Sequence, residues 1–142
     1  MHKSKLAGFI IDCQTSDLAA AARFWSDALG MAVEELPGAE GERYVKLKDP
    51  TEQLQIEVQS VDHASRVHLD IETDNIPAEV ERLQALGAKV VEYVQSWCVM
   101  QAPTGQRFCV INRASARFDH QANSWQDQAA GRAGLTARQR KP

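Results

Sequence analysis

The chain has 142 residues, which suits one compact domain or two small fused units. Hydrophobic residues make up 44% and charged residues 25%, as in ordinary soluble globular proteins. The formal net charge of −3 excludes a general attraction to nucleic acid or to an anionic membrane, and no apolar run is long enough to cross a bilayer.

The first half of the chain predicts one strand, one helix and three further strands. An apolar strand at 7–13 leads through a polar N-cap cluster at 15–17 into a helix over 18–29. Gly30 follows, where a helix C-cap favours a residue that adopts positive φ. The turn-forming segments PGAEGE and DPTE then separate strands at 31–36, 43–48 and 53–59.

The second half repeats this order of signals. A strand at 66–71 and an N-cap cluster at 73–75 precede a helix over about 76–86, which ends before Gly87. Three further strands follow at 88–93, 96–101 and 107–112. The sequence therefore predicts an α+β fold of two βαβββ modules, about 6–60 and 65–112, within a domain of residues 1–112. Together they would form a curved, barrel-like, eight-stranded mixed sheet with outer helices.

Residues 113–142 form a C-terminal arm with a net charge of +4, while the first 112 residues carry −7. From about Asp127 the arm has almost no large apolar residue, so we expect its end to be flexible. Phe118 and Trp125 are large aromatic residues separated by polar ones. We therefore predict that 113–125 pack on the domain or across a dimer interface with both rings buried.

The three cysteines, Cys13, Cys98 and Cys109, each lie in an apolar, strand-like run. Their odd number and their surroundings indicate reduced thiols rather than a disulfide framework, so we expect a cytoplasmic protein.

Strand alternation predicts which side chains leave the helix-covered face of the sheet. The apolar sets Leu54/Ile56/Val58, Val67/Leu69/Ile71 and Phe108/Val110 are expected beneath the helices. The opposite, concave face then receives Gln55, Glu57 and Gln59, His68 and Asp70, and Arg107, Cys109 and Ile111. Glu57 and His68 thus share a face, in strands that could be neighbours. Such a pair suits a divalent metal, a hydrogen-bonded pair that orients a ligand, or a plain solvated strand face.

Three segments carry a resemblance to a known family: residues 17–31, 66–91 and 102–111. They resemble the vicinal oxygen chelate superfamily, which includes glyoxalase I, extradiol dioxygenases and bleomycin resistance proteins, and within it the glyoxalase-like subgroup. The resemblance covers residues 6–112 and implies a concave small-molecule site, often in a homodimer. It is more specific for the fold than for the chemistry.

The resemblance also implies a metal held by one residue from each of four strands. The matching positions are Glu57, His68, Cys109 and either Gly8 or Ile10. Neither Gly nor Ile coordinates through a side chain, and a cysteine in an apolar strand commonly acts as a small hydrophobe. We therefore expect a divalent metal (Zn, Mn, Fe or Ni) to be bound weakly or not at all.

Two functions remain open at this stage, with a pure interaction protein ranked below both. The first is a metal-assisted lyase, isomerase or dioxygenase, with Glu57 as base or ligand and His68 as ligand. The second is a metal-free protein that binds or sequesters a small molecule, as bleomycin resistance proteins do. In that case the lining residues would be Tyr44, Trp97, Met100 and Arg107.

Overall fold

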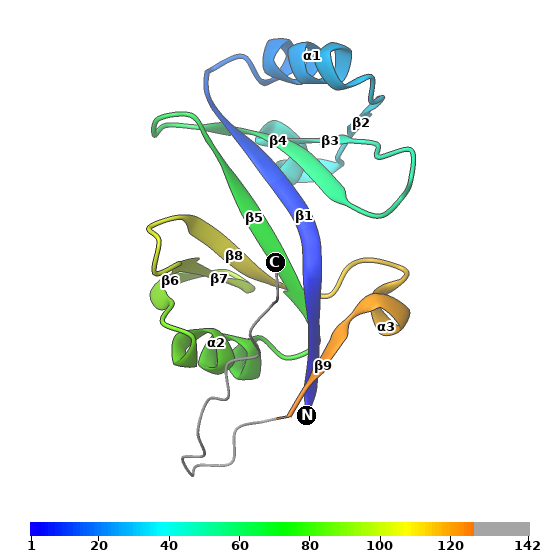
Figure 1. Ribbon diagram of the computed structural model, residues 1–142. Coiled ribbons are helices and arrows are strands. Elements are labelled where there is room, and N and C mark those ends of the chain that lie inside the picture. Colours follow the sequence, from blue (N-terminus) through cyan, green and yellow to red (C-terminus); the bar gives the residue numbers. More distant parts are fainter. Residues whose placement is uncertain (127–142) are drawn as a thin grey trace, which may run out of the picture.

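The computed structural model describes residues 1–126, which fold around one open, curved sheet (Figure 1). The strands are β1 (His2–Gln14), β2 (Val33–Glu35), β3 (Tyr44–Leu47), β4 (Gln55–Val61), β5 (Arg66–Thr73), β6 (Lys89–Val94), β7 (Trp97–Gln101), β8 (Arg107–Asn112) and β9 (Asn123–Trp125). The helices are α1 (Leu18–Leu29), α2 (Ile76–Ala85) and α3 (Phe118–Gln121), with a 3-10 helix η1 at Gly38–Glu42.

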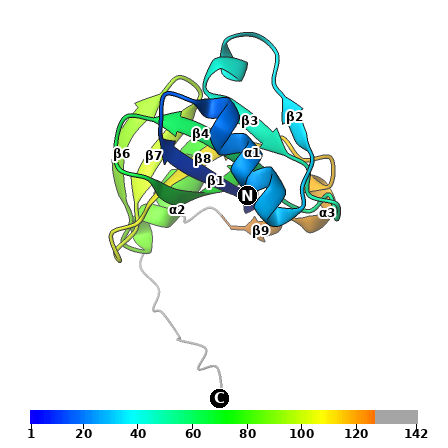
Figure 2. The ribbon, with the colours of Figure 1, turned by 90° about the horizontal axis from the view of Figure 1, so that it is seen from above.

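The two predicted βαβββ modules are confirmed. The strand order is β2-β3-β4-β1-β5-β8-β7-β6, so each module contributes four adjacent strands. The first strand of each module runs parallel to its last, as β1 with β4 and β5 with β8, and the modules join through the antiparallel pair β1–β5. The sheet curves but does not close, and the short ninth strand β9 adds to β1 (Figure 2).

Both long helices begin at side-chain caps and end beside a glycine. Asp17 accepts a hydrogen bond from the backbone N–H of Ala20 at 3.0 Å, and Asn75 accepts one from Ala78 at 3.1 Å. Gly30 ends α1 in the left-handed region, with φ of 66°. The predicted bounds of α1 are confirmed, whereas α2 ends at Ala85, one residue before the predicted end.

Each helix covers its own apolar core on the outer face of the sheet. Under α1 the core contains Leu47, Ile56 and Val58, and under α2 it contains Val80, Leu83, Ala88, Cys98, Met100 and Val110. Val67 and Leu69 were also expected beneath a helix, but they are 57% and 51% exposed. They lie on the strand that joins the modules, between the two helix-covered cores, so that part of the prediction is wrong.

The first part of the C-terminal arm packs on the domain, and of its two aromatic rings only that of Phe118 is buried as predicted. Phe118 is 2% exposed, and Trp125 is half-buried, with its indole N–H donating to Ser4 Oγ at 2.8 Å. The predicted flexible end, from Asp127, lies outside the described residues. Within residues 1–126, none of the helices has the length and apolar character of a membrane span.

Candidate functional site

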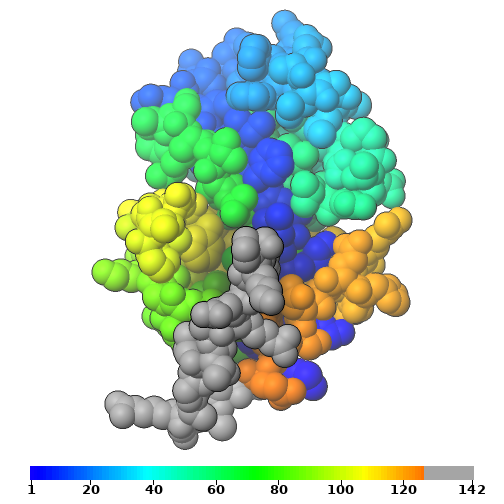
Figure 3. All heavy atoms as spheres, viewed as in Figure 1, coloured from blue at the N-terminus to red at the C-terminus, as the bar shows by residue number. Residues whose placement is uncertain are grey.

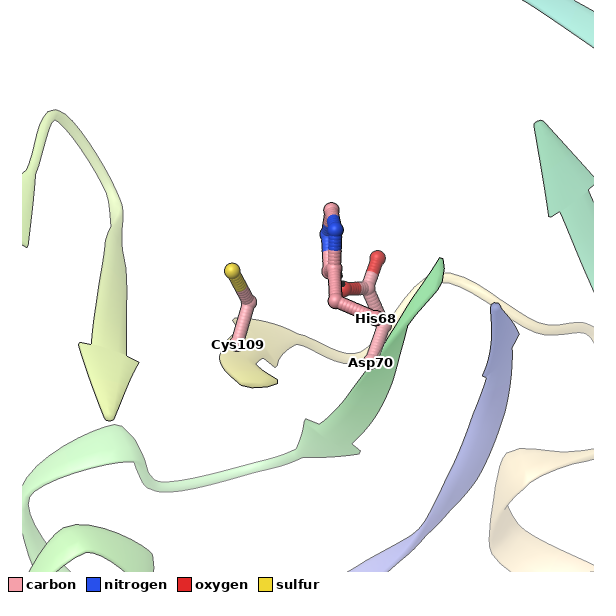
Figure 4. Close-up of side chains that lie close together, drawn as sticks. All are labelled: His68, Asp70 and Cys109. Atoms are coloured by element: carbon pink, nitrogen blue, oxygen red, sulfur yellow. Dashed lines mark ion pairs between the residues drawn. The ribbon is translucent and has the colours of Figure 1, made fainter. Parts of the chain in front are cut away.

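Three potential metal ligands converge on the concave face of the sheet. His68 and Asp70 alternate along β5, and Cys109 of β8 is the register partner of Asp70. One ligand atom from each residue lies within 4.8 Å of the others, and all three side chains are half-buried. Figure 4 shows them projecting from β5 and β8 to the same side. We call His68, Asp70 and Cys109 the β5–β8 cluster.

A carboxylate from the first module fixes the orientation of the His68 ring. His68 Nδ1 lies 2.6 Å from Oδ2 of Asp12 in β1, and Asp12 is 2% exposed. The other ring nitrogen, Nε2, therefore faces the cluster, 3.4 Å from Asp70 Oδ1. Burial lowers the pKa of His68, but the Asp12 and Asp70 carboxylates and the Cys109 thiol outweigh it and raise the pKa to about 11.

Two buried carboxylate oxygens at this site have no hydrogen-bond donor among the described residues: Asp12 Oδ1 and Asp70 Oδ1. Asp70 Oδ1 lies at ion-pair distance from His68 Nε2, but the direction of approach does not fit a hydrogen bond. A buried acceptor without a donor is costly. At Asp70 a cation would remove that cost, and nitrogen, oxygen and sulfur donors together suit Zn²⁺ or Fe²⁺. The residues of the β5–β8 cluster therefore fit a divalent metal.

Glu57 lies on the same face but outside the cluster. The order β4-β1-β5 places Ile10 between Glu57 and His68, so the two strands are not neighbours, although the sequence allowed that arrangement. Two strand spacings separate the Cα atoms of the pair by about 10 Å. Burial, together with the negative charge of Asp70, raises the pKa of Glu57 to about 7. A carboxyl group with such a pKa can give and take a proton near neutral pH.

The structure explains why β1 provides no ligand. Gly8 follows a β-bulge at Ala7 and lies so close to its β4 partner that a Cβ at Gly8 would be 1.8 Å from the carbonyl oxygen of Gln55. A side chain at position 8 would therefore require the backbone of β1 or β4 to shift. Ile10 is 4% exposed and forms an apolar divider between Glu57 and His68.

The four residues predicted to line the site separate into two groups. Tyr44, Trp97 and Arg107 are half-buried and follow the alternation of the concave face. The Tyr44 hydroxyl accepts a hydrogen bond from the Gln59 amide at 2.8 Å, and burial together with the Glu57 charge raises its pKa to about 12. Met100 is fully buried in the core under α2, on the opposite face, so it does not line the site.

Asp12 and Asp70 are the site residues that sequence reasoning missed. Alternation placed both on the concave face without assigning them a role. The spacing His-x-Asp in a strand was a usable signal for Asp70, because residues i and i+2 point to the same side. The contact between Asp12 and His68 depends on the pairing of β1 with β5, which sequence spacing does not contain.

A model of the glyoxalase-like domain matches residues 8–111 of this chain. The chain belongs to the glyoxalase-like family. This places it in the vicinal oxygen chelate superfamily, as the resemblance of its sequence indicated. A comparison with curated protein sequences finds no match.

Solved structures with the same glyoxalase-like fold are distant in sequence. Methylmalonyl-CoA epimerase from Mycobacterium tuberculosis is 16% identical, with a TM-score of 0.59, over 77% of this chain and 87% of that one. A hypothetical protein from Bacillus halodurans is 10% identical, with a TM-score of 0.59, over 78% and 95%. A variant of Streptomyces coelicolor methylmalonyl-CoA epimerase, bound to 2-nitronate-propionyl-CoA, is 14% identical, with a TM-score of 0.54, over 78% and 97%. Identities this low show a shared fold only.

This glyoxalase-like chain also has a cavity on its outer face, away from the cluster. The cavity has a volume of about 660 Å³ and lies between α1 and η1. Its lining includes Leu18, Ala22, Arg23, Glu42 and Val45. Val45 alternates with the concave-face residues of β3, so the cavity and the cluster lie on opposite sides of the sheet.

Proposed function

We propose that this protein is a metal-dependent enzyme that moves a proton on a small substrate, at a carbon next to a carbonyl group. The observation that supports it best is the convergence of a ring nitrogen of His68, a carboxylate oxygen of Asp70 and Cys109 Sγ within 4.8 Å of one another. Three protein ligands leave a coordination position for substrate, as in catalytic zinc sites. Among the reactions open to the fold, this choice favours an isomerase or lyase over a dioxygenase.

The proposed ligand set differs from that predicted by sequence, because Asp70 replaces Glu57. Asp12 orients the His68 ligand: its carboxylate lies 2.6 Å from Nδ1 of His68 and so leaves Nε2 for coordination. A divalent metal in this position would polarise the carbonyl oxygen of a bound substrate and make the neighbouring C–H more acidic.

Glu57 is the proposed general base. Its carboxyl group lies on the concave face outside the ligand set, so it remains free to accept a proton from the substrate. The pKa of about 7 means that a large fraction is ionised at neutral pH while the group keeps useful basicity. Two nearby basic side chains favour the ionised form of Glu57: Lys46, its register partner on β3, and His68.

A second candidate function is metal-free binding of a small molecule. The observation that favours it is the raised pKa of His68, about 11, which describes an imidazolium already balanced by the carboxylates of Asp12 and Asp70. Such a trio needs no metal for charge balance. A ligand would then occupy the concave face without reacting.

Metal analysis of protein purified without chelator distinguishes the two candidates. The metal-dependent proposal expects about one equivalent of a transition metal, lost in His68→Ala and Cys109→Ser. The matched controls His63→Ala, in an exposed loop, and Cys13→Ser, on the helix-covered face, should keep it. Wild-type protein without metal after reconstitution with Zn²⁺, Mn²⁺, Fe²⁺ and Ni²⁺ would refute the proposal.

Proton transfer is tested by the exchange of substrate C–H for deuterium in D₂O, followed by NMR. The panel contains small 2-oxo acids and acyl thioesters, starting with methylmalonyl-CoA because that compound is named for structures of similar fold. Glu57→Gln should lower exchange roughly 100- to 10,000-fold, the usual contribution of a general base, while metal content stays unchanged. Equal exchange by Glu57→Gln and wild type would exclude Glu57 as the base.

A further inference from the structure

The concave face is much less accessible at one end than at the other. Arg66, His68, Asp70 and Glu72 occupy alternate positions along β5, so all four side chains point to this face. Their side-chain exposure falls along the strand, from 47% at Arg66 through 14% and 15% at His68 and Asp70 to 0% at Glu72. Another part of the chain therefore covers the concave face beside Glu72, directly after the β5–β8 cluster.

The cover is the first part of the C-terminal arm, residues 113–121. The backbone N–H groups of Ala114 and Ser115 donate to Glu72 Oε2 at 2.8 and 3.0 Å, and Ser115 Oγ donates to Oε1 at 2.5 Å. Lys5 Nζ lies 3.5 Å from the same carboxylate. These bonds lower the pKa of Glu72 against the effect of its burial, so the carboxylate binds the arm in its ionised form.

The later part of this segment and β9 after it are held along the N-terminal half of β1. Lys5 Nζ donates to the side chain of Gln121 at 2.9 Å, and Phe118 is 2% exposed. β9 then pairs with the start of β1, and Arg82 stacks on the Trp125 ring at 4.0 Å. Figures 1 and 3 show the arm against this end of β1. Because these contacts fix it at several points, this part of the arm is an ordered, integral part of the domain.

We propose that residues 113–121 form the end wall of the concave site and that ligands enter from the opposite end, past Tyr44, Gln59 and Arg66. Two strand positions separate Asp70 from Glu72, about 7 Å, so the wall stands close to the cluster. The site therefore accepts little ligand bulk toward the arm, and larger groups extend toward Arg66. The link to a substrate rests on the proposed function, whereas the wall itself does not.

The Cys109 thiol provides a direct probe of access, because Cys109 lies one concave-face position before the row that the arm covers. Metal-free full-length protein is alkylated with iodoacetamide or with a bulky fluorescein maleimide, and peptide mass spectrometry gives the rate at each cysteine. Gln59→Trp narrows the proposed entrance and should slow labelling of Cys109 roughly tenfold or more while leaving Cys13 unchanged.

The arm is tested in the Gln59→Trp background. Glu72→Gln removes the charged acceptor of the arm, and Ser115→Ala removes one donor as a milder change. Either should restore Cys109 labelling roughly tenfold, since loss of a charge-assisted hydrogen bond shifts local opening by at least that factor. Gln84→Ala, exposed on α2, is the control. Circular dichroism at the labelling temperature shows which variants remain folded.

Three outcomes decide the matter. Slow labelling in Gln59→Trp with recovery on arm release supports both the wall and the entrance. Unchanged labelling in Gln59→Trp overturns the proposed entrance, and failure of both folded arm variants to restore labelling overturns the wall. Protection of Cys109 by added Zn²⁺ is measured separately in wild type and reports on the proposed metal site alone.

Discussion

Replacement of Glu57 by glutamine should stabilise the protein at neutral and alkaline pH. Glutamine keeps the size of the side chain and cannot ionise. The folded-state pKa of Glu57 is about 7, compared with the ordinary value of 4.5. At about 1.4 kcal/mol for each pH unit, wild type loses about 3 kcal/mol of unfolding free energy by ionising this group in its buried position.

The sign of the effect follows from the two pKa values. Below about pH 4.5 the carboxyl group is protonated in both states, and its contribution to stability is fully present. As the pH rises the unfolded chain ionises first, while the folded protein holds its proton until about pH 7. Wild type therefore loses stability through this window, whereas Glu57→Gln does not.

Urea denaturation at about pH 4.5 and about pH 8 measures the difference. The variant should match wild type at the lower pH and exceed it by about 3 kcal/mol at the higher one, or by roughly 10 °C in melting temperature. Glu34→Gln, at an exposed position of β2, should show no such gain. A Glu57→Gln protein no more stable than wild type at pH 8 would refute the view that burial keeps this carboxyl protonated.

Three further predictions concern the β5–β8 cluster, Gly8 beside the bulge, and Glu79, a buried carboxylate of α2 that contacts His2, Ser4 and Arg82. Zn²⁺ affinity should rise at least about tenfold for each pH unit between pH 6 and 9, because the pKa of His68 is about 11 and its ring must lose a proton when the metal binds. Calorimetry in buffers of different ionisation heat measures that proton release, and finding none would contradict the prediction. Gly8→Ala should cost about 3 kcal/mol or more in urea denaturation, since its Cβ meets the Gln55 carbonyl, and a near-neutral result would mean that the bulge relaxes. Glu79→Ala should cost about 3–5 kcal/mol because it leaves Arg82 without its buried carboxylate, and a thermal melt equal to wild type would contradict this.

The fold was predictable because its signals are local and repeated. The caps at Asp17 and Asn75, the left-handed glycine after α1 and the apolar alternation each act within a few residues, and they occur twice in the same order. The short strand β9 was not predicted, since it exists only because β1 extends beyond β4 and offers a free edge. The exposure of Val67 and Leu69 likewise depends on where the helices end in space.

The site was predictable only as far as strand parity extends. Parity placed Glu57, His68 and Cys109 on one face, and the structure agrees. It could not give strand order, and the position of β1 between β4 and β5 separates Glu57 from His68. The same pairing brings Asp12 to His68. Distances across a sheet are decided by which strands are neighbours, and a single sequence does not state that.

The two modules use equivalent positions for different tasks. Asp12 lies five residues before the helix cap Asp17, and Asp70 lies five residues before the cap Asn75, so the two carboxylates are counterparts in the repeat. Seven residues before each cap stand Ile10 and His68. One half thus carries an imidazole where the other carries a hydrocarbon, and the aspartate of the hydrocarbon half serves the imidazole of its neighbour. In the proposed site, the second module therefore supplies all three metal ligands, while the first module supplies Asp12, which orients His68, and Glu57, the proposed base. Ile10 and His68 thus hold equivalent places in the repeat but have different chemistry.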